Sequence, residues 1–91
     1  MTVIFYTRAG CHLCDSAKEE LERICRRISF RIEVRDVDTN EAWVEKFGDE
    51  VPVGILDGRK VFKYRVDARR LESALRARLA LDSPPLVPEG S

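Results

Sequence analysis

Two cysteines, Cys11 and Cys14, stand three positions apart where an apolar run gives way to a helical pattern. Such a Cys-X-X-Cys pair can be half of a metal site, a packing detail or a redox-active dithiol. Thiol–disulfide exchange needs an accessible thiolate that attacks and a second thiol that displaces the product. The secondary-structure elements around the pair determine whether this chain can supply both the accessible thiolate and the second thiol.

Few other soft ligands accompany the pair. The one histidine, His12, lies between the two cysteines, and the third cysteine, Cys25, lies about 17 Å along the same expected helix at roughly 1.5 Å per residue. Because a structural zinc site needs four ligands, the sequence argues against a metal ion held by one monomer. An iron–sulfur cluster shared by two copies through Cys11 stays open as an alternative. We interpret Cys25 as a half-buried packing residue.

The pattern around the pair predicts a strand followed by a helix. Residues Thr2 to Tyr6 form a β-branched and aromatic run that is typical of a buried strand. Apolar residues then recur at spacings of 4, 4, 3 and 4, which predicts an amphipathic helix that starts near Cys11. These apolar positions are Leu13, Ala17, Leu21, Ile24 and Ile28.

A helix that begins near Cys11 affects the chemistry of that thiol. Unpaired N–H groups of the first turn and a dipole charge of roughly +0.5 favour the thiolate, and Arg8 adds a positive charge three residues earlier. We therefore expect the pKa of Cys11 to lie below the value of about 8.5 for a free cysteine. Cys14 lies one turn further on and points toward the buried stripe, so it is the expected resolving thiol. His12 is expected to tune the thiolate of Cys11, the expected nucleophile.

The middle of the chain predicts a second strand and a short helix. Phe30, Ile32 and Val34 alternate with charged residues, which is the period of a strand with one wet face. Asp38 with Glu41 three residues later offers an N-cap for a short helix that ends at Gly48.

The last third predicts a hairpin and a final helix. Asp57-Gly58 lies between two apolar runs and suits a type I′ turn. Asp67 then caps a helix. The apolar face of that helix is expected to comprise Leu71, Ala74, Leu75 and Leu79.

The order of elements is thus β-α-β-α-β-β-α. A right-handed crossover makes the first two strands parallel, and the two-residue hairpin makes the second pair antiparallel. The sequence predicts an α/β fold with a four-stranded mixed sheet and helices on its faces. We expect one domain over residues 1–82 and a disordered C-terminal tail over residues 83–91, which contains three of the four prolines.

Sixteen basic and sixteen acidic side chains cancel, so no global field favours nucleic acid or an anionic membrane. The N-terminal segment lacks the features of a signal peptide, and no apolar run approaches the roughly 18 residues of a membrane span. We expect a cytoplasmic monomer. Residues 36–50 hold six acidic residues and one basic residue, whereas residues 59–78 hold eight basic and two acidic ones. We interpret both segments as ordinary solvated surface.

These motifs resemble the glutaredoxins of the thioredoxin-fold superfamily, over about residues 2–80. The resemblance rests on the run Tyr6-Thr7-Arg8-Ala9-Gly10-Cys11-His12-Leu13-Cys14, on Val51-Pro52 ahead of a hairpin and on the Asp-capped last helix. It is closest to small glutaredoxin-like proteins with a Gly-Cys-His-Leu-Cys site. It implies a thioredoxin-like fold with a cis peptide at Pro52, opposite the cysteines.

The resemblance also implies a function. It indicates a thiol–disulfide oxidoreductase that uses its dithiol to reduce protein or glutathione mixed disulfides, with no bound cofactor. Val51 would offer backbone hydrogen bonds to the substrate or glutathione, and Arg8 would meet a glutathione carboxylate. Glutathione or another thiol reductant system would supply the electrons.

One segment departs from the glutaredoxin pattern. Glutathione-binding glutaredoxins usually have a Gly-Gly pair and an acidic residue before the last helix, whereas this chain has Lys63-Tyr64-Arg65-Val66-Asp67. Asp67 and the helix N-terminus remain as expected substrate contacts. A protein disulfide as the real partner and a catalytically silent binding module both stay open as alternatives.

Overall fold

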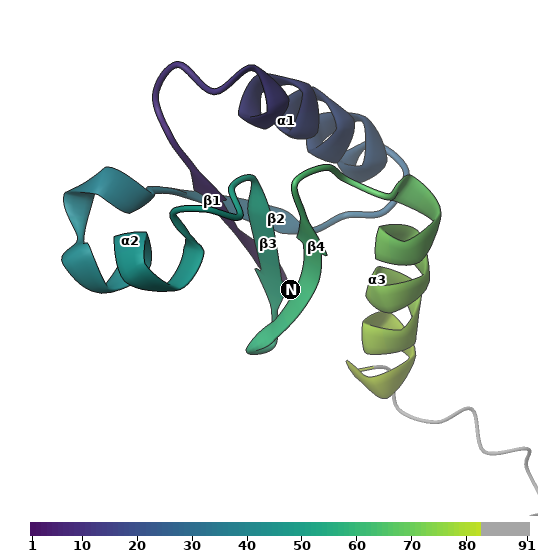
Figure 1. Ribbon diagram of the computed structural model, residues 1–91. Coiled ribbons are helices and arrows are strands. Elements are labelled where there is room, and N and C mark those ends of the chain that lie inside the picture. Colours follow the sequence, from purple (N-terminus) through teal and green to yellow (C-terminus); the bar gives the residue numbers. More distant parts are fainter. Residues whose placement is uncertain (83–91) are drawn as a thin grey trace, which may run out of the picture.

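A four-stranded mixed sheet in the order β2-β1-β3-β4 forms the centre of the fold (Figure 1). The computed structural model describes residues 1–82. Strand β1 (Thr2–Thr7) pairs in parallel with β2 (Arg31–Asp36) and antiparallel with β3 (Val53–Leu56). Strand β3 in turn pairs antiparallel with β4 (Arg59–Lys63). The predicted mixed sheet is confirmed, with parallel first strands and an antiparallel second pair.

Within residues 1–82, three α-helices and one 3₁₀ turn connect and cover the strands. They are α1 (His12–Cys25), η1 (Val37–Thr39), α2 (Glu41–Phe47) and α3 (Ala68–Asp82). None of the helices within the described part of the chain is both long and apolar enough to cross a membrane. The tail predicted for residues 83–91 lies outside the described residues.

The two faces of the sheet carry separate hydrophobic clusters, because successive strand residues point to opposite sides. Phe5 of β1 packs with Leu21 of α1 and Leu71 of α3 in the larger cluster. Tyr6, the next residue, packs on the other face in a smaller cluster with Phe47 of α2. The Tyr6 ring stacks on Phe47 at 4.3 Å and meets Trp43 edge-on at 5.6 Å, measured between ring centroids. These ring contacts pack α2 against this face of the sheet.

Three apolar residues assigned to buried faces are exposed instead. Leu13, Val34 and Leu79 keep 48%, 52% and 40% of their surface accessible. Leu13 lies in the first turn of α1, at the end of the helix beside the loop from β1. Val34 lies on β2, which is an edge strand of the sheet (Figure 1), and Leu79 lies in the last turn of α3. Helical or strand periodicity assigns a face but does not show where the neighbouring element ends, so these three predictions were wrong.

The second helix also begins differently from the prediction. Asn40, rather than Asp38, is its N-cap and accepts a hydrogen bond from the N–H of Ala42 at 2.9 Å. The carboxylate of Asp38 instead pairs with Arg8. The predicted end of the helix at Gly48 is confirmed.

The predicted turns at the end of the chain are confirmed. Asp57 and Gly58 both have positive φ, 52° and 78°, as a type I′ turn requires. The carboxylate of Asp67 accepts a hydrogen bond from the N–H of Arg70 at 3.1 Å, so it caps α3 as expected. The hairpin and the cap together set the direction in which the chain returns from β4 to α3.

The β3–β4 pairing leads to a test of the core. Gly54 lies opposite Phe62, and a Cβ atom at residue 54 would overlap the Phe62 ring. We predict that Gly54→Ala lowers the free energy of unfolding by about 1–3 kcal/mol, the usual cost of overpacking, as measured by urea denaturation. Phe62→Leu removes the ring, so the double variant should lose less than the two single losses added together. Strictly additive losses would contradict the steric explanation.

Candidate active site

Cys11 is the N-cap of α1, which links its sulfur directly to the helix. Its backbone is extended, with φ −92° and ψ 107°, and its Sγ accepts a hydrogen bond from the backbone N–H of Cys14 at 3.1 Å. This N–H is one of the donors that the first turn of a helix leaves unpaired. A sulfur anion accepts such a bond more strongly than a neutral sulfur, because bonds to ionised acceptors are the stronger ones. The cap therefore favours the thiolate of a reduced Cys11.

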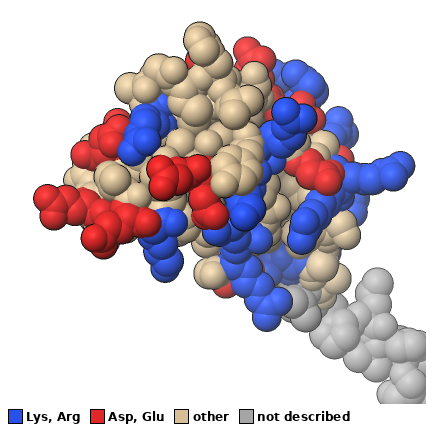
Figure 2. All heavy atoms as spheres, viewed as in Figure 1, with Lys and Arg blue, Asp and Glu red and all other residues tan. Residues whose placement is uncertain are grey.

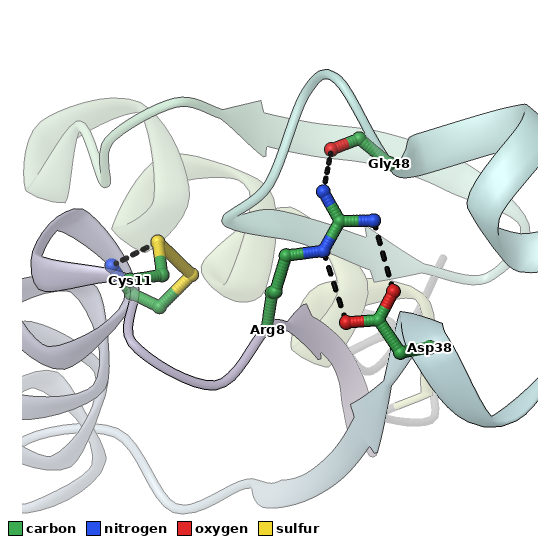
Figure 3. Close-up of a disulfide and its surroundings, with 5 residues drawn as sticks. Arg8, Cys11, Asp38 and Gly48 are labelled. Atoms are coloured by element: carbon green, nitrogen blue, oxygen red, sulfur yellow. Dashed lines mark hydrogen bonds and ion pairs between the residues drawn. A yellow bond between two sulfur atoms is a disulfide. The ribbon is translucent and has the colours of Figure 1, made fainter.

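Cys11 and Cys14 are joined in a disulfide, with their Cα atoms 5.2 Å apart (Figure 3). Cys14 is buried, with 2% of its surface exposed, whereas Cys11 is half-buried. The two sulfurs thus lie within bonding reach, and the second is the more shielded, as the helical spacing predicts. Their roles as nucleophile and resolving thiol stay predictions.

Residues 8–11 join β1 to α1, and we call them the cysteine loop. The loop before β3 lies at the same edge of the sheet as the cysteine loop. Tyr6 pairs with Val53, so Pro52 falls beside the end of β1, where the chain leaves for Cys11. The Val51–Pro52 peptide bond is cis, as the resemblance implies. Val51 packs against the same hydrophobic cluster that contains Cys14.

The β4–α3 loop joins this edge through backbone hydrogen bonds. The N–H of Tyr64 donates to the carbonyls of Pro52 at 2.9 Å and of Glu50 at 3.1 Å. Tyr64 has φ 69°, a left-handed conformation that favours glycine. A bulky residue here therefore keeps a glycine-like backbone, while its side chain is 47% exposed. Asp67 follows as the cap of α3, so its carboxylate lies at this end of that helix.

Arg8 ties the cysteine loop to the α2 region. Its Nε and Nη2 donate to the two carboxylate oxygens of Asp38 at 3.1 and 3.0 Å, and its Nη1 donates to the carbonyl of Gly48 at 3.1 Å. The hydrogen bond with Asp38 raises the pKa of Arg8 above its ordinary value. Figure 3 shows the guanidinium turned toward Asp38 and Gly48 rather than toward the sulfurs. Arg8 thus holds the loop in place, and its expected contact with a thiolate or a glutathione carboxylate stays a prediction.

The two residues between the cysteines lie at the surface. His12 and Leu13, between the cysteines, are both exposed. Among residues 1–82, no group of three or more His, Cys, Asp or Glu side chains is arranged to hold a metal ion. Sequence reasoning missed Asp38 and Gly48 as partners of Arg8. The acidic segment 36–50 offered a general signal for such a partner, but nothing in its spacing singled out Asp38.

A family model and a curated relative each match most of this chain. A family model described as "Glutaredoxin-like domain (DUF836)" matches residues 2–76. A Dictyostelium discoideum protein named "Glutaredoxin-like protein YDR286C homolog" is 39% identical over 77 residues, which cover 78% of this chain and 71% of that protein.

Solved structures have the same fold. The X-ray structure of target protein XcR50 from X. campestris is 34% identical, with a TM-score of 0.67 over 82% of this chain and 96% of that one. Thioredoxin 1 from Thermosipho africanus is 18% identical, with a TM-score of 0.60 over 87% and 99% of the two chains. The second likeness shows a thioredoxin-like fold alone.

The capping role of Cys11 predicts a difference between two substitutions. In the reduced protein, Cys11→Ala should lower the free energy of unfolding by about 1 kcal/mol relative to Cys11→Ser, because serine is a good N-cap and alanine is not. Neither variant can form the disulfide, so denaturation under reducing conditions isolates the cap. Equal stabilities would show that the side chain at residue 11 does not cap α1.

The Arg8–Asp38 pair predicts a local effect on the cysteine loop. We expect Asp38→Asn to speed amide hydrogen exchange severalfold at residues 9–11, because the loop loses a charged anchor and opens more often. The matched control is Glu72→Gln, which weakens the two-bond pair of Arg27 with Glu72 on α3. Exchange at residues 9–11 that is unchanged in Asp38→Asn, or equally faster in both variants, would contradict the anchoring role.

Proposed function

Since this chain belongs to the glutaredoxin-like domain (DUF836) family, we propose that it is a dithiol–disulfide oxidoreductase that reduces protein disulfides or glutathione mixed disulfides. The observation that carries the proposal is the hydrogen bond from the Cys14 N–H to Cys11 Sγ at the start of α1. It supports an activated thiolate at Cys11, with a buried partner sulfur already within bonding reach.

The reaction has two exchange steps. The thiolate of reduced Cys11 attacks one sulfur of the substrate disulfide, so a mixed disulfide forms and the other substrate sulfur leaves as a thiolate that takes up a proton. Cys14, once deprotonated, then attacks Cys11 Sγ and releases the second substrate sulfur. The substrate gains two electrons and two protons, and the protein ends with the Cys11–Cys14 disulfide. Burial of Cys14 favours this order, because an external disulfide reaches the more exposed sulfur first.

The neighbouring residues have proposed roles in binding. Val51 and the cis Pro52 lie beside the cysteine loop, where their backbone suits an extended substrate or glutathione. Asp67, at the start of α3, is a proposed contact for the amino group of such a substrate. We propose that Arg8 and the exposed His12 raise the local positive potential near Cys11, with Arg8 acting from its place beside Asp38.

The oxidised protein needs a thiol reductant to return to the dithiol form. We propose that glutathione or a reductase-linked thiol system reopens the disulfide, and that the chain works as a monomer without a resident cofactor. A cytoplasmic location suits this cycle, because reducing compartments keep such thiols available. The left-handed Tyr64 and its bulky neighbours, where glutathione-binding glutaredoxins have glycines, favour a protein disulfide over glutathione as the substrate.

A set of cysteine variants tests the proposal. Cys14→Ser should accumulate a mixed disulfide with the substrate, seen as an added mass, because the second exchange step is lost. Cys11→Ser should reduce turnover in an insulin or mixed-disulfide assay to the background of the free reductant. Cys25→Ser is the matched control and should keep full turnover, because the Cys25 thiol donates to the Phe30 carbonyl at the other end of α1.

Two results would contradict the proposal. Equal turnover by wild type and Cys11→Ser would remove the proposed nucleophile. A wild-type disulfide that neither glutathione nor a thioredoxin-reductase system opens would instead favour a binding module that no longer turns over.

A further inference from the structure

Charges of opposite sign lie apart on one side of the molecule. Figure 2 shows Asp and Glu gathered over the region of η1 and α2, whereas Lys and Arg form a band over β4 and α3. The same division is present in the sequence, with six acidic residues in 36–50 and eight basic residues in 59–78. Since the net charge of the chain is zero, this asymmetry is local.

A hollow of about 370 Å³ lies within the basic band, and we call it the basic groove. It is lined by β4 from Lys60 to Lys63, by Arg65 and Asp67 of the β4–α3 loop, and by Arg70 in the first turn of α3. Four of these side chains are cations and one is a carboxylate, so the lining carries a formal charge of 4 − 1 = +3.

The cations of the basic groove differ in how far they are neutralised. Lys60 and Lys63 share the carboxylate of Glu50, at 2.5 and 3.5 Å, and the hydrogen bond from Lys60 lowers the pKa of Glu50. The guanidinium groups of Arg65 and Arg70 have no ion-pair partner within residues 1–82. These two exposed arginines are therefore the charges left for a ligand.

The basic groove adjoins a second hollow that includes a residue from between the two cysteines. A second hollow, of about 310 Å³, lies between α1 and the β4–α3 loop and is lined by Leu13, Ala17, Arg65 and Val66, among others. Arg65 lines both hollows, and Leu13 lies between the two cysteines. A segment that lies in the basic groove can thus extend past Arg65 into the second hollow, toward the helix turn that carries the two cysteines.

We propose that the basic groove binds an acidic segment of the protein whose disulfide is reduced, so that it selects substrates by charge. This inference rests on the proposed oxidoreductase function. Carboxylates of a partner fit Arg65 and Arg70 because a guanidinium can donate two parallel hydrogen bonds to a carboxylate. The carboxylate of Asp67 interrupts the cations of this lining, which fits the separated charges of a protein segment better than the continuous charge of a phosphate backbone.

The basic groove would recognise the acidic segment through its side chains rather than through backbone pairing of an added strand with β4. Strand β4 is an edge strand, but its register with β3 shifts between Gly54 and Ile55. Such irregularities twist an edge away from regular pairing with another strand. Binding should therefore depend on ionic strength more than on a β-forming sequence.

The experiment compares two peptide disulfides of equal length, one flanked by glutamates and one by lysines. We expect wild type to reduce the acidic peptide with a kcat/KM about tenfold higher, and the ratio to approach one as salt rises from about 0.01 to 1 M. Arg65→Glu with Arg70→Glu should reverse the preference. The control is Arg26→Glu with Arg31→Glu, which changes the net charge equally at exposed positions near the far end of α1 and should keep the wild-type preference.

The outcomes separate the inference from the proposed function. If wild type reduces both peptides equally well, or if both double variants change the preference alike, the inference is overturned while the oxidoreductase function stands. If neither peptide is reduced, the proposed function fails. Binding of the acidic peptide with serines in place of its cysteines, followed by fluorescence anisotropy, then decides the inference without turnover. Binding that Arg65→Glu with Arg70→Glu abolishes supports the groove, and equal binding by both double variants overturns it.

Discussion

The hydrogen bond from the backbone N–H of Cys14 to the sulfur of Cys11 is the interaction on which the site depends. It exists only because Cys11 occupies the N-cap of α1, with an extended backbone directly before the first helical residue. One residue earlier or later, the sulfur would not face an unpaired N–H of the first turn. The same position sets Cys14 one turn further on, where it is buried against the sheet. Helix capping and thiol chemistry thus impose the same requirement on one side chain.

The pairing of the strands brings other segments of the chain close to the capped start of α1. Antiparallel pairing of β1 with β3 brings the cis Pro52 beside the end of β1, and the hydrogen bonds of Tyr64 bring the β4–α3 loop to the same edge. Arg8 then anchors the cysteine loop to Asp38 and the Gly48 carbonyl. Three segments far apart in the sequence therefore meet near the disulfide, and Arg65 of the β4–α3 loop also lines the basic groove along β4.

Much of this arrangement could be predicted from local sequence patterns. The Cys-X-X-Cys spacing at a strand-to-helix boundary predicts both the cap region and the reach between the sulfurs, and Asp57-Gly58 predicts the hairpin that orders β3 and β4. Long-range details could not be predicted in this way. The pairing of Arg8 with Asp38 depends on how η1 folds over the loop, and the left-handed Tyr64 depends on acceptors supplied by Glu50 and Pro52. Leu13 was misassigned because helical spacing assigns it to the apolar face, whereas in the first turn of α1 it keeps 48% of its surface exposed.

The most direct test of the account is the ionisation of Cys11 in the reduced protein, followed by the ultraviolet absorbance of the thiolate as pH changes. A Cys14→Ser variant with Cys25→Ser leaves Cys11 as the only titrating thiol and retains the backbone N–H of residue 14. The account predicts a midpoint clearly below the value of about 8.5 for a free cysteine, because the helix N-terminus stabilises the anion. A midpoint at or above that value would contradict the claim that the start of α1 activates this sulfur.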